Sequence, residues 1–251
     1  MNWLPFAIAG AIAQLVDGTV GMGFGLTSST IILTLGASAA AASAAVHLAE
    51  LGTTLASGVS HWRRENVDFF ILKHLALPGG LGAFLGATFL SWIDLSSART
   101  FISTVLLFLG FLLLYRTIFR ADQREKLSGE VSPGYLRFLG FGGGFLDAAG
   151  GGGWGPVVTP TLLTTTAAEP RKVIGTVSAS EFIVACSASL GFLISLSRLD
   201  MNWSVVIGLA VGGVLMVPMA ARFVGVISGK ALGIIVGVAI VTINAARLLG
   251  V

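Results

Sequence analysis

The sequence predicts an all-α polytopic membrane protein built from two repeats, and three observations support this fold class. First, 55% of the 251 residues are apolar and only 11% are charged, whereas a soluble domain carries about 25% charged residues. Second, apolar runs of about twenty residues, the length that crosses a bilayer as a helix, recur along the whole chain. Third, two glycine-rich segments interrupt this pattern, and they match one another at a shift of 130 residues.

Six hydrophobic spans are expected to form membrane-crossing helices. Between the third and the fourth lies the least apolar stretch, residues 120–134, which is rich in charged residues and is typical of a solvated cytoplasmic linker. We therefore divide the chain into a first transmembrane repeat (1–119), this linker (120–134) and a second transmembrane repeat (135–251). The six spans are residues 40–60, 69–92, 99–119, 172–197, 203–226 and 230–249.

The two glycine-rich segments are the clearest sign of the repeat. Residues 17–25 read Asp-Gly-Thr-Val-Gly-Met-Gly-Phe-Gly, and residues 147–155 read Asp-Ala-Ala-Gly-Gly-Gly-Gly-Trp-Gly. Beyond them, Glu50 aligns with Glu181 at a shift of 131 residues. So many glycines would interrupt a continuous helix. Paired breaks at corresponding positions of two hydrophobic halves point to the binding site of a transporter.

Short apolar arms flank each glycine break. Each arm has 11–13 residues, about 17–20 Å as a helix, which is too short to cross a hydrocarbon core of about 30 Å. The two arms form either one broken crossing or a re-entrant hairpin. With hairpins, 12 of the 15 Lys and Arg residues lie on the cytoplasmic side, and with crossings 10 do. The positive-inside rule thus favours hairpins, which orient the two halves oppositely as an inverted repeat. The arms are residues 4–16, 26–36, 135–146 and 156–168.

Both breaks predict a polar site inside the membrane, because irregular backbone is tolerated there only where protein buries it or where it lines a cavity. The arm after each break begins near the bilayer centre, and a helix N-terminus offers unpaired N–H groups and a partial positive charge. Two such termini make an anion site without a buried arginine. The residues expected to bind the substrate are Gly21, Gly23, Phe24, Gly25, Thr27, Ser28, Gly151, Gly152, Gly153, Trp154, Gly155 and Thr159.

Ionisable residues inside the hydrophobic spans are the second group of candidates. Glu50 and Glu181 lie at equivalent positions of the two repeats. Because burying a carboxylate within a membrane helix costs free energy, such a residue indicates a function. Either glutamate could exchange protons during transport, or it could brace a glycine loop by accepting N–H groups. His47 lies one turn before Glu50 and could tune it, shuttle a proton or satisfy a local polar need. Asp17 and Asp147 precede the breaks and are expected to accept loop N–H groups, because a bare negative charge would oppose anion binding.

Nothing in the sequence indicates catalytic or cofactor chemistry. No cluster of His, Cys and carboxylate residues has metal-ligand spacing, and the glycine segments lack the features of nucleotide-binding loops. We therefore expect no enzyme activity, no cofactor and no metal. The net charge of +3 comes from cations beside the hydrophobic spans, which is a topology signal rather than a nucleic-acid site. The expected partners are a small anion and the lipid bilayer, and the oligomeric state stays open.

In these segments the chain resembles the TauE/SafE sulfite exporter family (the TSUP permeases). The resemblance covers nearly the whole chain and depends on two segments in which an aspartate precedes Gly-x-Gly-aromatic-Gly, and on Gly-Gly-Gly-Trp-Gly-x-x-x-x-Pro over residues 151–160. The first segment departs from the common form at Met22, and Thr30 stands where the second half has Pro160. The resemblance implies a secondary transporter that exports sulfite or an organosulfonate across the bacterial inner membrane. A passive anion channel and an importer of a related sulfur oxyanion are the alternatives.

Overall fold

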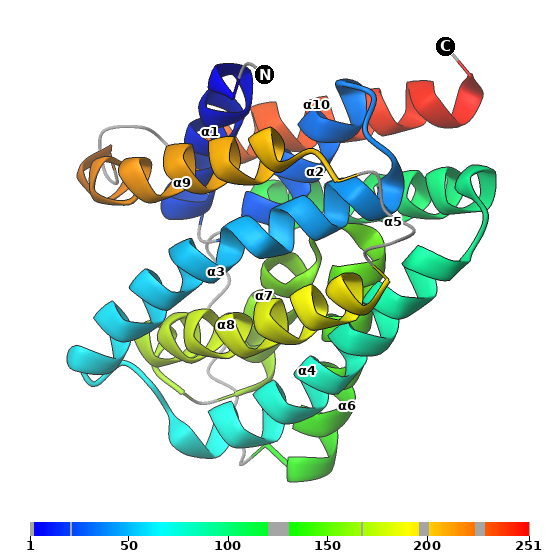
Figure 1. Ribbon diagram of the computed structural model, residues 1–251. Coiled ribbons are helices and arrows are strands. Elements are labelled where there is room, and N and C mark those ends of the chain that lie inside the picture. The colour runs from blue at the N-terminus through cyan, green and yellow to red at the C-terminus, as the bar shows by residue number, and fades with distance from the viewer. Residues whose placement is uncertain are drawn as a thin grey trace.

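Helices make up most of the chain in the computed structural model of the protein (Figure 1). The described residues are 3–20, 22–119, 131–166, 168–195, 201–223 and 229–250. Over these residues there are ten helices and no β-strand, which confirms the all-α class. The helices are α1 (Leu4–Val20), α2 (Phe24–Thr34), α3 (Ala39–Arg63), α4 (Phe69–Trp92), α5 (Leu95–Phe119), α6 (Pro133–Gly150), α7 (Trp154–Thr165), α8 (Pro170–Ile194), α9 (Trp203–Phe223) and α10 (Gly229–Leu249).

The first five helices correspond in order to the last five. In each set, two helices that flank a glycine break precede three helices of 21 to 25 residues. Corresponding helices begin 129 to 134 residues apart, close to the shift found in the sequence. The paired starts are Leu4 and Pro133, Phe24 and Trp154, Ala39 and Pro170, Phe69 and Trp203, and Leu95 and Gly229.

Four of the described helices, α4, α5, α8 and α10, are long and apolar enough to cross a membrane. The predicted spans at α3 and α9 form helices too, but they do not meet this criterion. α3 has 25 residues, about 37 Å, so its length suffices. Its composition is too polar for the criterion, because the helix contains Ser43, His47, Glu50 and Thr54, which are buried within the protein.

Polar caps set two helix starts that hydrophobicity alone did not predict. α5 begins four residues before the predicted span, because the Asp94 carboxylate accepts a hydrogen bond of 2.9 Å from the Ser97 amide. Hydrogen bonds from Ser96 and Ser97 also hold the pKa of Asp94 well below its usual range. α6 begins at Pro133, inside the predicted linker, because Ser132 accepts a hydrogen bond from a backbone amide at the helix start. Linker residues 120–130 lie outside the described residues.

The halves pack reciprocally through glycines. α1 of the first half packs against α9 of the second, and α6 of the second packs against α4 of the first. A Cβ atom added to Gly144 would lie 2.0 Å from the carbonyl oxygen of Gly79, and one added to Gly212 would lie 1.9 Å from that of Ala7. Small residues therefore allow the backbones of these helix pairs to approach closely, as in other membrane helix interfaces.

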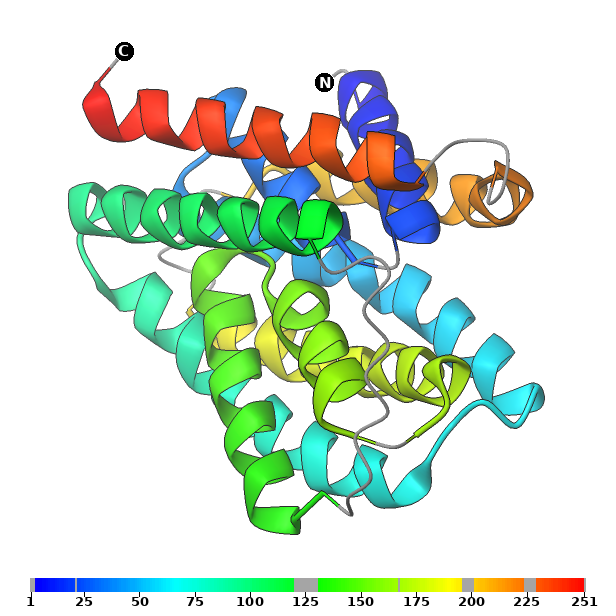
Figure 2. The ribbon, with the colours of Figure 1, turned by 180° about the vertical axis from the view of Figure 1, so that it is seen from behind.

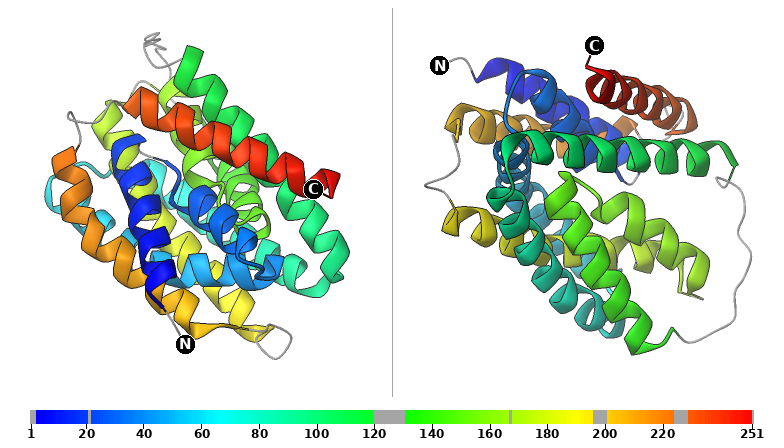
Figure 3. Two further views of the ribbon diagram at one scale, coloured as in Figure 1. Left: turned by 90° about the horizontal axis from the view of Figure 1, so that it is seen from above. Right: turned by 90° about the vertical axis from the view of Figure 1, so that its right-hand side faces the viewer.

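Each pair of helices around a glycine break forms a hairpin. In Figure 1, α1 runs from the N-terminus at the top towards the centre of the molecule. In Figure 2, α6 rises from the bottom towards the centre, and α7 turns back down. The tips of the two hairpins thus point towards each other, while α5 and α10 lie side by side at one side of the molecule (Figure 3). How the two halves are oriented in the membrane stays a prediction.

Candidate functional site

The two glycine breaks touch through their backbones. A Cβ atom added to Gly25 would lie 2.6 Å from Gly152 Cα, and one added to Gly152 would lie 2.3 Å from the carbonyl carbon of Gly25. Gly152 also has a φ of 132°, a conformation that favours glycine. The equivalent contact joins Gly155 to Met22, whose Cβ would lie 3.1 Å from an added Cβ. The breaks therefore cross at matching positions of the two repeats.

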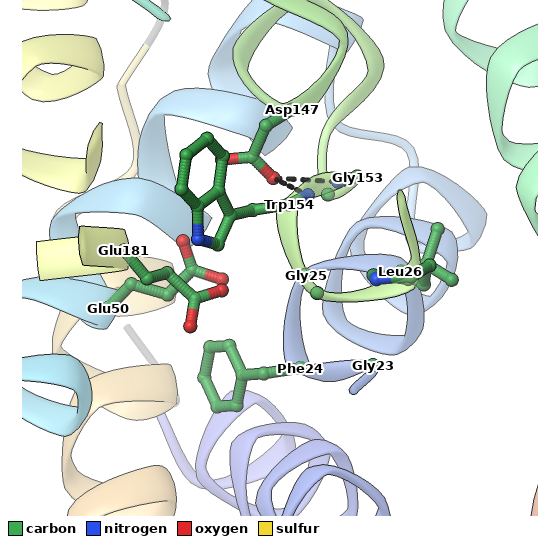
Figure 4. A pocket seen from close by; sticks show the side chains of 12 residues that line it. Gly23, Phe24, Gly25, Leu26, Glu50, Asp147, Gly153, Trp154 and Glu181 are labelled. Atoms are coloured by element: carbon green, nitrogen blue, oxygen red, sulfur yellow. Dashed lines mark hydrogen bonds between the residues drawn. The ribbon is translucent and has the colours of Figure 1, made fainter. Parts of the chain in front are cut away.

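A small cavity lies at this crossing. Its volume of about 10 Å³ is room for about one water molecule. Figure 4 shows the aromatic rings of Phe24 and Trp154 on opposite sides of the carboxyl groups of Glu50 and Glu181. Residues 23–26 and 152–156, together with Glu50, Asp147 and Glu181, line the cavity.

The predicted binding residues fall into three groups. Seven line the cavity, namely Gly23, Phe24, Gly25, Gly152, Gly153, Trp154 and Gly155. The others do not line it: Thr27, Ser28 and Thr159 are buried in α2 and α7, and the carbonyl of Gly151 accepts a hydrogen bond from the Ser29 hydroxyl. Gly21 lies outside the described residues. Leu26 and Pro156 line the cavity without having been predicted, because each helix begins at the aromatic residue and brings its whole first turn to the cavity.

Each break is held by the aspartate that precedes it. Asp147 Oδ1 accepts hydrogen bonds from the amides of Gly153, at 2.6 Å, and Trp154, at 2.9 Å. In the first half, the Asp17 carboxyl accepts hydrogen bonds from the amides of Gly23 and Phe24. These are the loop N–H groups that the position of both aspartates predicts. Each aspartate satisfies donors that the start of α2 or α7 would otherwise leave unpaired.

The two glutamates reach the cavity side by side, with their carboxyl groups close together (Figure 4). Glu50 is on α3 and Glu181 on α8, and these helices pack along one another. Asp17 and Asp147 are close enough to act on both electrostatically, and no Lys or Arg is among the described residues that line the cavity. Within the described part of the chain, no hydrogen bond joins either glutamate carboxyl to a glycine break. The cavity is therefore surrounded by carboxyl groups that need protons or a cation to be neutral.

His47 pairs with Asp147 rather than with Glu50. Its Nε2 lies 3.1 Å from Asp147 Oδ2, and its Nδ1 lies 2.8 Å from the carbonyl oxygen of Ser43. Both partners of the His47–Asp147 pair are buried. The helical spacing places His47 and Glu50 on one face of α3. The hydrogen-bond partner of His47 is nevertheless Asp147, which lies on α6 and is 100 residues away in the sequence.

The aromatic residue after each break packs onto the opposite half. The Trp154 ring is fully buried, and an added Cβ on Gly79 of α4 would lie 2.7 Å from it. Trp154 Nε1 also donates to the carbonyl of Val177 at 3.2 Å. Phe24 lies against Gly213 of α9, where an added Cβ would come within 3.1 Å of the ring. Each hairpin tip is thereby attached to a helix of the other repeat.

Comparison with known proteins finds a family model and a relative that match nearly the whole chain. The model of the family described as "Sulfite exporter TauE/SafE" matches residues 6–247. A relative from Bacillus subtilis (strain 168), "Probable membrane transporter protein YtnM", is 46% identical over 247 residues, which cover 98% of this chain and 82% of the relative. No solved structure matches the chain.

Proposed function

Because the chain belongs to the TauE/SafE sulfite exporter family of multi-pass membrane transporters, we propose that it exports a small sulfur-containing anion, sulfite or an organosulfonate, by secondary transport. The observation that carries this proposal is the arrival of two helix N-termini, those of α2 and α7, at one cavity. Such termini favour anions through their dipoles and their unpaired amides.

Backbone amides bind the anion in this proposal. Asp17 and Asp147 occupy the first amides of α2 and α7, and the next amide in each helix belongs to Gly25 and to Gly155. Both glycines line the cavity, and neither has a side chain that would keep an anion away from the backbone. The rings of Phe24 and Trp154 form the apolar walls between which the anion is desolvated.

Protons on Glu50 and Glu181 accompany the anion in this proposal, so export is driven by the outward gradient of the anion and responds to the pH difference across the membrane. Two unit charges 4 Å apart repel by about 4 kcal/mol at an effective dielectric constant of 20, so an anion and ionised glutamates exclude each other from so small a cavity. Both carboxyl groups line the cavity beside the glycine breaks, where a bound anion would meet them, and this position supports proton exchange. The anion therefore occupies the site when the glutamates are protonated.

The small cavity corresponds to a closed site, which alternating access requires in part of the transport cycle. A space for about one water does not hold a sulfur oxyanion, so the hairpin tips must separate and close again in each cycle. Alternating access of this kind requires two states of the same site, as in other repeat-built transporters.

Flux measurements on purified protein in liposomes test this function. Sulfite, sulfoacetate and thiosulfate are offered in turn, with and without an imposed pH gradient, and protein-free liposomes serve as the control. We expect saturable sulfite or organosulfonate flux that responds to the pH gradient. Flux that rises linearly with concentration and ignores the gradient would instead identify a passive channel, and no flux of any of these anions would contradict the proposal.

A further inference from the structure

Asp147 poses an electrostatic problem at the site. Its carboxylate holds the amides of Gly153 and Trp154 in place, and it also lines the cavity. A full negative charge there would repel the anion that the cavity is proposed to bind. None of the described residues that line the cavity is a lysine or arginine that could offset this charge.

The hydrogen bonds of His47 show how many protons the His47–Asp147 pair holds. His47 Nδ1 lies 2.8 Å from the Ser43 carbonyl oxygen, which only accepts, so Nδ1 carries a hydrogen. The Ser43 hydroxyl, 3.4 Å from Nδ1, donates to the Ala148 carbonyl at 2.6 Å. It therefore also faces Nδ1 as an acceptor.

The other nitrogen, Nε2, lies 3.1 Å from Asp147 Oδ2. One proton fills this hydrogen bond, whether it sits on the imidazole or on the carboxyl group, and the pair as a unit is then neutral. Without that proton, two lone pairs would face each other in a buried site, which is costly. The Phe192 ring, whose centroid lies 6.0 Å from that of His47, helps to keep water away.

We propose that His47 is a positioning residue that shares this proton with Asp147, so that Asp147 holds the second glycine break without adding a negative charge to the anion site. The role in anion affinity depends on the function proposed above. Among the described residues, the other ionisable groups that act electrostatically at the cavity are the carboxyl groups of Asp17 of α1, Glu50 of α3 and Glu181 of α8. His47 supplies an imidazole to this group of carboxyls.

The first glycine break, which Asp17 holds, lacks an equivalent pair. The residue at the position equivalent to His47, using the shift of 131 that aligns Glu50 with Glu181, is Ser178. Asp17, the counterpart of Asp147, therefore has no imidazole at the matching position. The two repeats thus differ in the partner of the aspartate that holds each glycine break.

A cycle of substitutions tests the proposal. His47→Gln keeps a hydrogen-bond donor towards Asp147 but leaves the carboxylate charge uncompensated. Combining it with Asp147→Asn removes that charge and keeps an oxygen acceptor for the two loop amides. We expect His47→Gln to raise KM for sulfite about tenfold with kcat within about twofold of wild type. The double variant should recover KM to within about threefold, and Ser178→Ala is the matched control without effect.

Thermal unfolding of the same detergent-purified variants gives a readout that needs no substrate. An unpaired buried charge destabilises a protein, so the midpoint should fall for His47→Gln and recover in the double variant. A double variant that is as impaired as His47→Gln in both KM and midpoint overturns the proposal, and so does a His47→Gln variant equal to wild type. If the midpoints follow the cycle while the wild type moves no sulfite, the proton-sharing pair stands and the proposed substrate fails.

Discussion

Replacing Gly25 with alanine places a methyl group where the two hairpin tips cross. The new Cβ would lie 2.6 Å from Gly152 Cα and 3.3 Å from Glu50 Oε1, whereas non-bonded carbons normally stay about 3.5–4.0 Å apart. The breaks must therefore move apart by about 1 Å. Overpacking of this kind costs about 1–3 kcal/mol, and it displaces the amide proposed to bind the anion.

Gly142→Ala is the matched control for this experiment. It makes the same chemical change within α6, at a glycine whose added Cβ would meet nothing within 4 Å. Alanine there raises helix propensity by about 1 kcal/mol, so the control should be at least as stable as wild type.

Both variants are compared in liposomes at equal protein content and by thermal unfolding in detergent. We expect Gly25→Ala to lower the unfolding midpoint and to reduce sulfite flux at least tenfold, while Gly142→Ala keeps wild-type flux. A Gly25→Ala protein that matches Gly142→Ala in both measurements would refute the claim that the breaks meet in this geometry.

Three further predictions follow from the site and the topology. Wild-type sulfite flux should rise when the anion enters from the more acidic side, and Glu50→Gln and Glu181→Gln should abolish this response to an imposed pH gradient. An unchanged pH profile in both variants would exclude proton coupling through these residues. Trp154→Phe removes the hydrogen bond to Val177 and should cost about 1 kcal/mol of stability, seen as a lower unfolding midpoint; an unchanged midpoint would show that this bond is not stabilising. In a Cys186→Ser background, cysteines placed at Lys172 and Arg99 should react with impermeant reagents from opposite faces of the membrane. If both cysteines react from the same face, the inverted arrangement is contradicted.

The broken hairpins could be predicted because glycine runs have a local cause and a local effect. A helix cannot continue through Gly151–Gly153, and the structure ends α6 at Gly150 and restarts at Trp154. The order of the ten helices follows from the same local reasoning. Helix starts were less accurate, because a single capping side chain such as Asp94 extends a helix beyond its hydrophobic span.

Contacts between distant segments could not be predicted residue by residue. The approach of Gly25 to Gly152 depends on how four helices pack, and the pairing of His47 with Asp147 depends on the depth at which α6 ends beside α3. Met22 shows the same limit. Its departure from glycine was visible in the sequence, but only the structure shows that it touches Gly155.

A structure of the protein determined by electron cryomicroscopy in the presence of sulfite tests the central claim most directly. We predict density for the anion between the first turns of α2 and α7, within hydrogen-bond distance of the amides of Gly25 and Gly155, with the hairpin tips further apart than they are here. Sulfite bound elsewhere, with the tips still in contact and the space between them empty, would contradict the claim that the two glycine breaks form the anion site.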